Sequence, residues 1–247
     1  MLKLSRQAFL AGGIMDYGNG RAGVIDVGAV DWERYALPIF EGLEQNSIEM
    51  FFQAIGASVQ NHEKGSRILR AYDENPYVCI LVEGNAQVIS EDRFGNEAVG
   101  HYLERGSLFG CPAAVLGEEY NCISIDATTD VMVLRIPYKN LLTKGIHLGK
   151  IHGIVMQNFL KILSRKMVLM MRKIEVLSQK TVRERLTVYL LHEEETQHAE
   201  RVCIPGRVQL AKYLECNRSA LTREISHMKE EEILEAGDGW MRLLKKI

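Results

Sequence analysis

The hydrophobic positions near the end of the chain predict two short helices joined by a tight turn. Apolar residues at helical spacing form one face over 207–214, and a polar break follows at 215–217. Apolar residues then return at helical spacing over 221–228. This arrangement is typical of a helix-turn-helix, in which the small side chain of Ala211 lets the second helix cross close to the first.

A β-hairpin is predicted directly after the second helix. Two apolar runs, 233–235 and 240–244, are separated by the segment 237–239, whose two glycines suit a tight turn. A small β wing after a recognition helix makes the segment 179–247 a winged helix-turn-helix.

Short apolar runs separated by glycine-containing turns occupy the region from Lys64 to Pro137. The runs with strand length lie at 77–82, 86–90, 98–103 and 131–136. Their near-regular spacing predicts an antiparallel, jelly-roll-like β-roll over 35–145. Helical clusters over 32–59 predict a short helix pair at its start. The glycine-rich segment 1–34 is expected to be a flexible extension.

One long helix is predicted over 147–177, within a segment 146–178 that leads to the last domain. Its apolar residues alternate by three and four positions, as in a coiled coil. They are Met156, Leu160, Leu163, Met167, Met170, Ile174 and Leu177. Three unbroken heptads exceed what a small roll can cover, so we expect a homodimer. The alternative is a helix buried in a monomeric core. The break at 178–180, before another helix over 181–192, is expected to be a hinge.

Composition and charge place few further limits on the protein. The 247 residues carry a net charge of −2, which argues against non-specific binding to polyanions, so DNA contacts would need locally placed cations. No apolar run is long enough to cross a bilayer, so we expect a cytoplasmic protein with no membrane partner. The five cysteines show no CxxC pair or zinc-site spacing. The predicted class is α+β.

The outward face of the second helix is the candidate DNA-reading surface. Its long guanidinium groups and short hydroxyls suit phosphates and guanine edges in a major groove. The alternative is an ordinary helical hairpin with a solvated charged face. The predicted DNA-binding residues are Arg207, Asn217, Arg218, Ser219, Thr222 and Arg223.

The order of the predicted elements resembles the Crp/Fnr superfamily of bacterial transcription regulators, over about 35–244. The most specific segments are 64–69, 80–84, 181–186 and 217–224. The resemblance implies a regulator, and not an enzyme, that binds a near-palindromic site in double-stranded DNA. It implies that the β-roll senses a signal and that the dimer helices transmit it, and it assigns base reading to Arg218, Ser219 and Arg223. Transcription activation would add RNA polymerase as a partner.

Two residues depart from the DNA-binding motif of that family. Glu215 stands where a turn glycine is usual, so a residue with a side chain is expected in a left-handed conformation. Glu224 stands where an apolar residue is usual, and we expect it to pair with a nearby arginine. Neither departure removes the reading face.

The sensor departs further from the family's cyclic-nucleotide cassette. Aligning the two puts Cys111 at the glutamate, Asn121 at the arginine and Cys122 at the serine. A cyclic phosphate needs a cation or a nest of backbone donors, and Asn121 carries no charge, so cAMP and cGMP are not expected. An iron–sulfur cluster needs four thiolates, which cluster-binding members of the family gather mostly near the N-terminus, and no cysteine here precedes Cys79. A lone histidine such as His62 or His101 does not by itself indicate a haem ligand.

We therefore expect a small, largely apolar or aromatic effector between the roll and the long helix. The residues predicted to line its pocket are Phe109, Gly110, Cys111, Pro112, Asn121, Cys122, Met156 and Phe159. Cys111 and Cys122 also permit a redox-responsive regulator, or they are simply small buried hydrophobes. A cupin-type metalloenzyme would need a histidine cluster that His62, His101, His147 and His152 do not form, so no metal or fixed cofactor is predicted.

Overall fold

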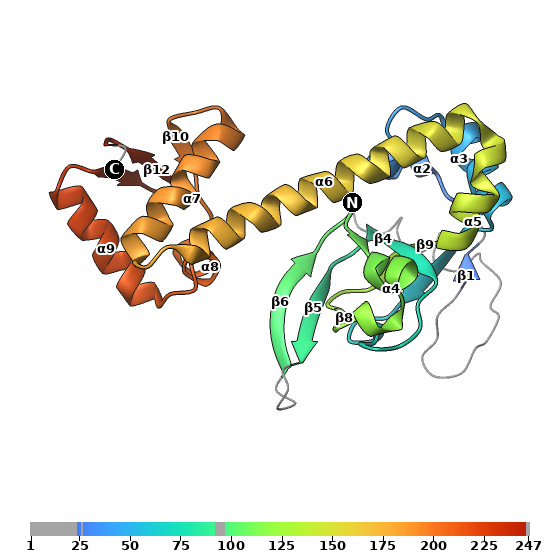
Figure 1. The fold of residues 1–247 in the computed structure, drawn as a ribbon, viewed down its shortest axis with the longest axis horizontal. Helices are drawn as coiled ribbons and strands as arrows, with labels where there is room; N and C mark the ends of the chain where they lie inside the picture. The colour runs from blue at the N-terminus through green and yellow to red at the C-terminus, as the bar shows by residue number, and fades with distance from the viewer. Residues whose placement is uncertain (1–23, 26, 92–96, 246–247) are drawn as a thin grey trace, which may run out of the picture. The chain divides into compact units, whose positions relative to one another are not determined.

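The computed structural model describes residues 24–25, 27–91 and 97–245, arranged in two compact units (Figure 1). The first unit ends at Ile162 and the second begins at Leu163. The helix α6 (Lys150–Ser178) starts in the first unit and ends in the second. The predicted flexible extension at 1–34 falls mostly outside the described residues. The predicted α+β class is confirmed.

The first unit begins with short helices that enclose an aromatic cluster. The elements are β1 (Val24–Ile25), the 3₁₀ helices η1 (Val27–Ala29) and η2 (Pro38–Phe40), α2 (Trp32–Tyr35) and α3 (Gln45–Ile55). The Phe52 ring packs edge-on against Trp32 and Phe40, with centroids 4.7 and 5.2 Å away. The indole nitrogen of Trp32 donates to the Val27 carbonyl at 2.8 Å. The predicted helix pair is present, but Val59 belongs to the following strand.

Two antiparallel sheets form the β-roll. One has the order β1-β2-β9-β4-β7 and the other β3-β8-β5-β6. The strands are β2 (Ser58–His62), β3 (Arg67–Leu69), β4 (Tyr77–Glu83), β5 (Ala86–Glu91), β6 (Glu97–Leu103), β7 (Leu108–Phe109), β8 (Ile123–Ala127) and β9 (Val131–Pro137). Between or after them lie α4 (Cys111–Leu116), η3 (Glu118–Tyr120), α5 (Tyr138–Thr143) and η4 (Gly145–Leu148).

The four predicted strands appear in the structure with ends within one residue of the prediction. Both faces of β4 and β9 are covered, which explains their almost continuous apolar sequence. Leu81 and Val133 pack inside the roll, whereas Ile80 and Leu134 are buried on the opposite face. β2 lies outside the predicted strands because most of its residues after Val59 are polar.

The second unit is a helix-turn-helix with a three-stranded wing. Its elements are α7 (Val182–Gln197), β10 (Arg201–Cys203), α8 (Arg207–Tyr213), α9 (Arg218–Glu230), β11 (Leu234–Gly237) and β12 (Trp240–Leu243). The predicted helices and hairpin are confirmed, although α7 extends beyond the predicted end at residue 192. The strand β10, which pairs with β12, is an addition to the prediction.

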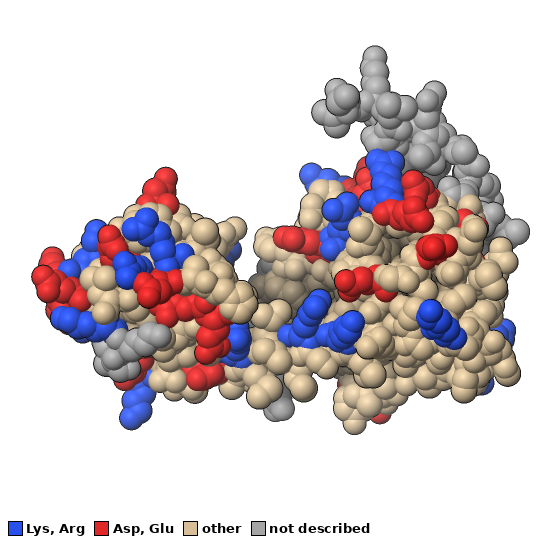
Figure 2. All heavy atoms as spheres, turned by 90° about the horizontal axis from the view of Figure 1, so that it is seen from above, with Lys and Arg blue, Asp and Glu red and all other residues tan. Residues whose placement is uncertain are grey.

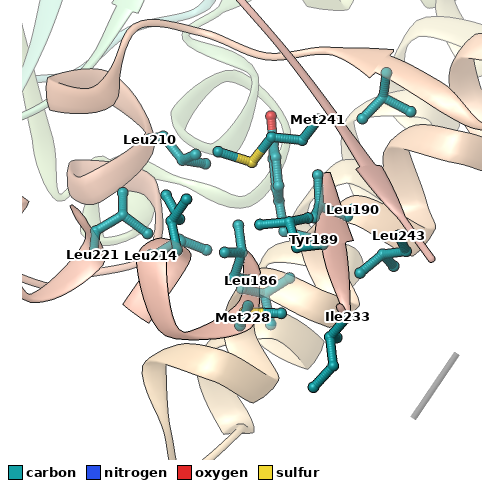
Figure 3. Close-up of a cluster of buried hydrophobic side chains, with 14 of the residues drawn as sticks. Leu186, Tyr189, Leu190, Leu210, Leu214, Leu221, Met228, Ile233, Met241 and Leu243 are labelled. Carbon is teal, nitrogen blue, oxygen red and sulfur yellow. The ribbon is translucent and has the colours of Figure 1, made fainter. Parts of the chain in front are cut away.

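One apolar cluster joins the elements of the second unit (Figure 3). Leu186 and Leu190 from α7 meet Leu210 from α8 and Leu221 from α9, and all four side chains are fully buried. Ala211 is also buried in this cluster, and α8 is in contact with α9. A small buried residue at this position agrees with the close helix crossing that the sequence predicts.

The break between α6 and α7 is present, but contacts from residues on both sides cross it. Val176, before the break, is fully buried in the cluster of the second unit. Arg172 donates to the carbonyl of His192 and pairs with Glu195 at 3.0 Å. After the break, Arg185 donates to the Gln179 carbonyl at 3.0 Å. A rotation at 178–180 would require these contacts to break, and the hinge there stays a prediction.

Candidate nucleic-acid interface and effector cavity

α9 separates an apolar face from a polar face. Leu221, Ile225 and Met228 are buried at helical spacing. The side chains of Arg218, Ser219, Thr222 and Arg223 lie on the exposed face. Neither Arg218 nor Arg223 forms an ion pair with another described residue, so both guanidinium groups have their donors available to a ligand.

The two flanking residues of the predicted interface differ in their surroundings. Asn217 is exposed at the N-cap of α9, and its side chain makes no capping hydrogen bond. Arg207 begins α8 and is half-buried, which lowers its pKa. Its Nη1 is buried with no hydrogen-bond partner among the described residues. Asn217 is therefore accessible to DNA, whereas Arg207 exposes only part of its guanidinium.

The turn before α9 is left-handed at Glu215, as predicted. This residue has a φ of +50°, a conformation that favours glycine. The next amide, of Cys216, donates to the Ala211 carbonyl at 3.0 Å and closes the turn. The Glu215 carboxylate lies 3.9 Å from the Lys173 ammonium. The turn therefore keeps its shape without glycine.

Glu224 pairs with Arg183, as predicted for an acidic residue at a usually apolar position. The Arg183 Nε donates to Glu224 at 2.6 Å, and the other two nitrogens donate to Glu231 at 2.6 and 2.8 Å. These bonds raise the pKa of Arg183 and lower the pKa of Glu231. One residue of α7 thus holds both the middle and the C-terminal end of α9.

Replacing Arg183 by methionine is expected to lower the free energy of opening of α9 by about 1–3 kcal/mol, because Glu224 loses a charge-assisted hydrogen bond. Hydrogen exchange of the α7 and α9 amides, measured by mass spectrometry, reports this change. The matched control is Arg242→Met, which removes a more exposed pair with Glu200 and is expected to change stability by about 0.5 kcal/mol or less. Equal effects of the two substitutions would contradict the assignment.

Charges of both signs are interspersed over the face of the molecule in Figure 2. No single basic field covers this view, in keeping with the net charge of −2. Nucleic-acid binding would therefore depend on the few arginines of α9 rather than on the total charge.

The predicted dimerisation face of α6 is largely uncovered. Four of its seven residues, Leu160, Met167, Met170 and Ile174, are between 58% and 65% exposed. The adjacent Val168, Leu169 and Met171 are exposed too, and they extend an uninterrupted apolar run over 167–171. Large exposed apolar patches mark interaction surfaces. These exposures disagree with the alternative of a helix buried in a monomeric core.

The β-roll holds a cavity of about 180 Å³. Its wall combines apolar side chains from several strands with polar groups from β2, β9 and the segment after β3. The lining residues are Gln60, His62, Ile68, Leu69, Arg70, Asp73, Glu74, Asn75, Cys79, Phe109, Val133 and Arg135. Of the predicted effector residues, only Phe109 lies in this wall.

The remaining predicted effector residues lie elsewhere. Asn121 is only 3% exposed, and its amide donates to the carbonyls of Arg70 at 2.7 Å and Asp73 at 3.3 Å. It therefore holds the loop after β3. The other positions are Cys111, half-buried, Pro112 and Cys122, exposed, Met156, half-buried, and Phe159, buried.

Gly110 is the N-cap of α4, with a φ of +74°. A Cβ at this position would lie 2.6 Å from the amide nitrogen of Asn75, which donates to the Gly110 carbonyl. Gly110 thus allows close packing of the loop before β4, and this is a structural role.

Arg135 supplies a cation that the sequence did not indicate. It lies near the end of β9, directly opposite Cys79 of β4, and its guanidinium is 3.7 Å from the centroid of the Tyr77 ring. Burial, and secondly Arg135, lowers the pKa of His62 to about 4. This cavity therefore differs from the mainly apolar pocket predicted around Cys111 and Asn121, because an arginine lines it. In the sequence, a single arginine within an apolar strand predicts a solvent-exposed position, so Arg135 was not expected in a cavity.

The cysteines are reduced and dispersed. None of the five is in a disulfide, and Cys122 is exposed whereas Cys79 is buried. Burial raises the pKa of Cys79 to about 12.

Within residues 24–25, 27–91 and 97–245, no three His, Cys, Asp or Glu side chains are grouped to hold a metal ion. In the same ranges, no helix has the length and apolarity to span a membrane.

Comparison with known proteins gives a domain assignment and a fold. Residues 59–144 match the model of the cyclic nucleotide-binding domain. No curated protein matches the sequence. A solved structure described as OCPA-complexed CprK is similar, with a TM-score of 0.56 and 15% identity over 82% of this chain and 92% of that chain.

Two further structures share the fold. The regulator CLP of Xanthomonas campestris, described as c-di-GMP responsive, has a TM-score of 0.52 and 19% identity over 82% of this chain and all of its own. A mutant of CooA from Carboxydothermus hydrogenoformans has a TM-score of 0.52 and 18% identity over 76% and 84% of the two chains. Residues 59–144 are therefore similar to the cyclic nucleotide-binding domain, and the chain shares the fold of CprK, CLP and CooA.

Proposed function

We propose that the chain is a sequence-specific DNA-binding transcription regulator of the Crp/Fnr type, active as a homodimer under the control of a small effector in the β-roll. The observation that carries this proposal is the exposed face of α9, where Arg218 and Arg223 have no ion-pair partner among the described residues. Such a regulator would act in the cytoplasm, and no enzymatic activity is proposed.

The polar face of α9 suits the major groove of DNA. Arginine binds the O6 and N7 acceptors of guanine with two parallel hydrogen bonds, and hydroxyls such as Ser219 and Thr222 bind bases or phosphates. Asn217 stands at the N-terminal end of this face, which is the end that contacts base edges in helix-turn-helix proteins. The buried cluster beneath α9 fixes the orientation of these side chains.

The exposed apolar residues of α6 support a parallel pairing of two copies. A two-fold dimer places its recognition helices about 34 Å apart, one turn of DNA. Two half-sites of the operator would then be bound together. RNA polymerase would be a further partner if the bound dimer activates transcription.

An effector would act by favouring one arrangement of the dimer over another, through its different affinity for the two. Contacts from Arg172 and Val176 hold the end of α6 against the rest of the second unit. A change transmitted along α6 would therefore take effect before Arg172. Asn121, at the position of the arginine that binds the phosphate in the family's cyclic-nucleotide cassette, is uncharged. Its side-chain amide donates to the Arg70 carbonyl, so it provides no cation for a cyclic phosphate.

Selection of duplexes from a random DNA pool by the full chain tests the proposal. We expect enrichment of a near-palindromic sequence with half-site centres about 10 base pairs apart, and binding that weakens as salt rises. The selection is run in parallel with an unrelated dimeric protein of similar net charge as a control. Recovery of a pool without a shared sequence would reject specific DNA recognition.

A further inference from the structure

The wall of the β-roll cavity includes Arg135, which forms no ion pair with a described carboxylate. Arg135 follows Val133 by two positions on β9, so both side chains point to the inside of the roll. Among residues 24–25, 27–91 and 97–245, Arg135 contacts the Tyr77 ring but forms no ion pair with a carboxylate. Arginine stays charged at physiological pH, so a half-buried guanidinium favours an anionic partner.

Two uncharged hydrogen-bonding side chains stand near Arg135 on the neighbouring strand. Gln60 pairs with Val133 and His62 with Val131 across β2 and β9, which places both side chains on the cavity side. Neither side chain has a hydrogen-bond partner among the described residues. Because its pKa is lowered to about 4, His62 is neutral at pH 7 and adds no second charge. Arg135 and these two neutral polar groups, from β9 and β2, therefore face the cavity together.

Apolar side chains form one part of the wall, which suits an apolar body of limited size. Ile68, Phe109 and Val133 supply apolar contacts. A cavity of about 150 Å³ is known to hold benzene, so 180 Å³ accommodates one aromatic ring with a small substituent. The charged residues Arg70, Asp73 and Glu74 also line the cavity, but their side chains are exposed and screened by solvent.

We propose that this cavity binds a compact organic carboxylate, with the carboxylate on Arg135 and the apolar body against Phe109 and Val133. Gln60 and His62 would bind a second polar substituent. The regulatory meaning of this site rests on the proposed function, in which the occupant is the effector. The site differs from the pocket around Cys111 and Asn121 that the sequence indicated.

Benzoate and its uncharged counterpart benzamide are the probes. Both are titrated into the full chain without DNA, by isothermal titration calorimetry and thermal shift. We expect benzoate to bind with a Kd of about 1 mM or lower, and benzamide to bind at least about tenfold more weakly, because only benzoate pairs with Arg135. This comparison needs no substitution, so it is independent of how any variant folds.

Substitutions then locate the site. Arg135→Gln is expected to weaken benzoate binding at least about tenfold, and Arg135→Lys to retain part of it. Arg105→Gln removes an exposed arginine outside the cavity wall and is expected to leave benzoate binding unchanged. Circular dichroism checks that each variant is folded.

Three results would overturn the assignment: no benzoate binding at about 10 mM, equal affinity for benzoate and benzamide, or unchanged benzoate binding in a folded Arg135→Gln variant. DNA binding is measured separately on the same protein without benzoate. Absence of benzoate binding in a protein that binds its operator would reject this inference alone. Benzoate binding in a protein that binds no operator would reject the proposed function alone.

Discussion

The double substitution Arg218→Ala and Arg223→Ala is expected to abolish specific operator binding and to leave the fold intact. Both side chains are exposed on α9 and pair with no described residue, so their loss removes no ion pair within the described part of the protein. Each arginine is expected to contribute about 1–3 kcal/mol to recognition of one base pair. The double variant should therefore lose roughly 30-fold or more in affinity for the selected operator.

Fluorescence anisotropy with the selected duplex and with a scrambled duplex measures this loss. Arg105→Ala serves as the charge control, because it removes an exposed arginine from the first unit. Each single variant is expected to relax the preference for one base of the half-site. Undiminished binding of the double variant to the operator would show that α9 is not the reading helix.

Glutamates at Met167 and Ile174 are expected to convert the protein to a monomer. The two side chains are 58% and 65% exposed in the single chain, so the substitution disturbs no internal packing. In a pair of helices, however, charges at these positions would be buried against apolar neighbours without a partner. Operator affinity should then fall by about 100-fold or more, because the second half-site is no longer bound by the same particle.

Analytical ultracentrifugation measures the mass of the particle, and anisotropy measures its affinity for DNA. The matched control puts two glutamates on the opposite side of the helix, at Lys161 and Arg165, both exposed. This control is expected to remain dimeric. A wild-type protein that sediments as a monomer, or a Met167/Ile174 variant that stays dimeric, would argue against pairing through α6.

The sequence predicted correctly those elements whose local hydrophobic pattern matches the burial of their residues in the fold. Leu221, Ile225 and Met228 repeat at helical spacing and are all buried, so α9 and its exposed face followed directly from the pattern. The unusual glutamates were also interpretable. Glu215 adopts the left-handed turn, and Glu224 finds an arginine, because each position allows only a narrow choice of conformation or partner.

The polar interior of the roll was not predictable in the same way. Gln60 and His62 belong to β2, in which Val59 is the single apolar residue, and Arg135 interrupts the apolar pattern of β9. The sequence therefore predicts a solvent-facing position for each. The structure brings them to a shared cavity because β2 and β9 are paired, with Ser58 opposite Arg135 although the two lie far apart in the chain. Such pairing over a long separation leaves no local signal.

The sequence alone determined the order of the elements, the helix α9 with its exposed polar face, and the apolar stripe of α6, since these depend on the periodicity of neighbouring residues. Only the tertiary structure decided that the end of α6 packs against the rest of the second unit and that Arg135 lines the cavity of the β-roll. Both depend on contacts of side chains such as Arg172 and Arg135 with residues that are distant in the chain. Such contacts depend on tertiary packing, which no local sequence pattern encodes.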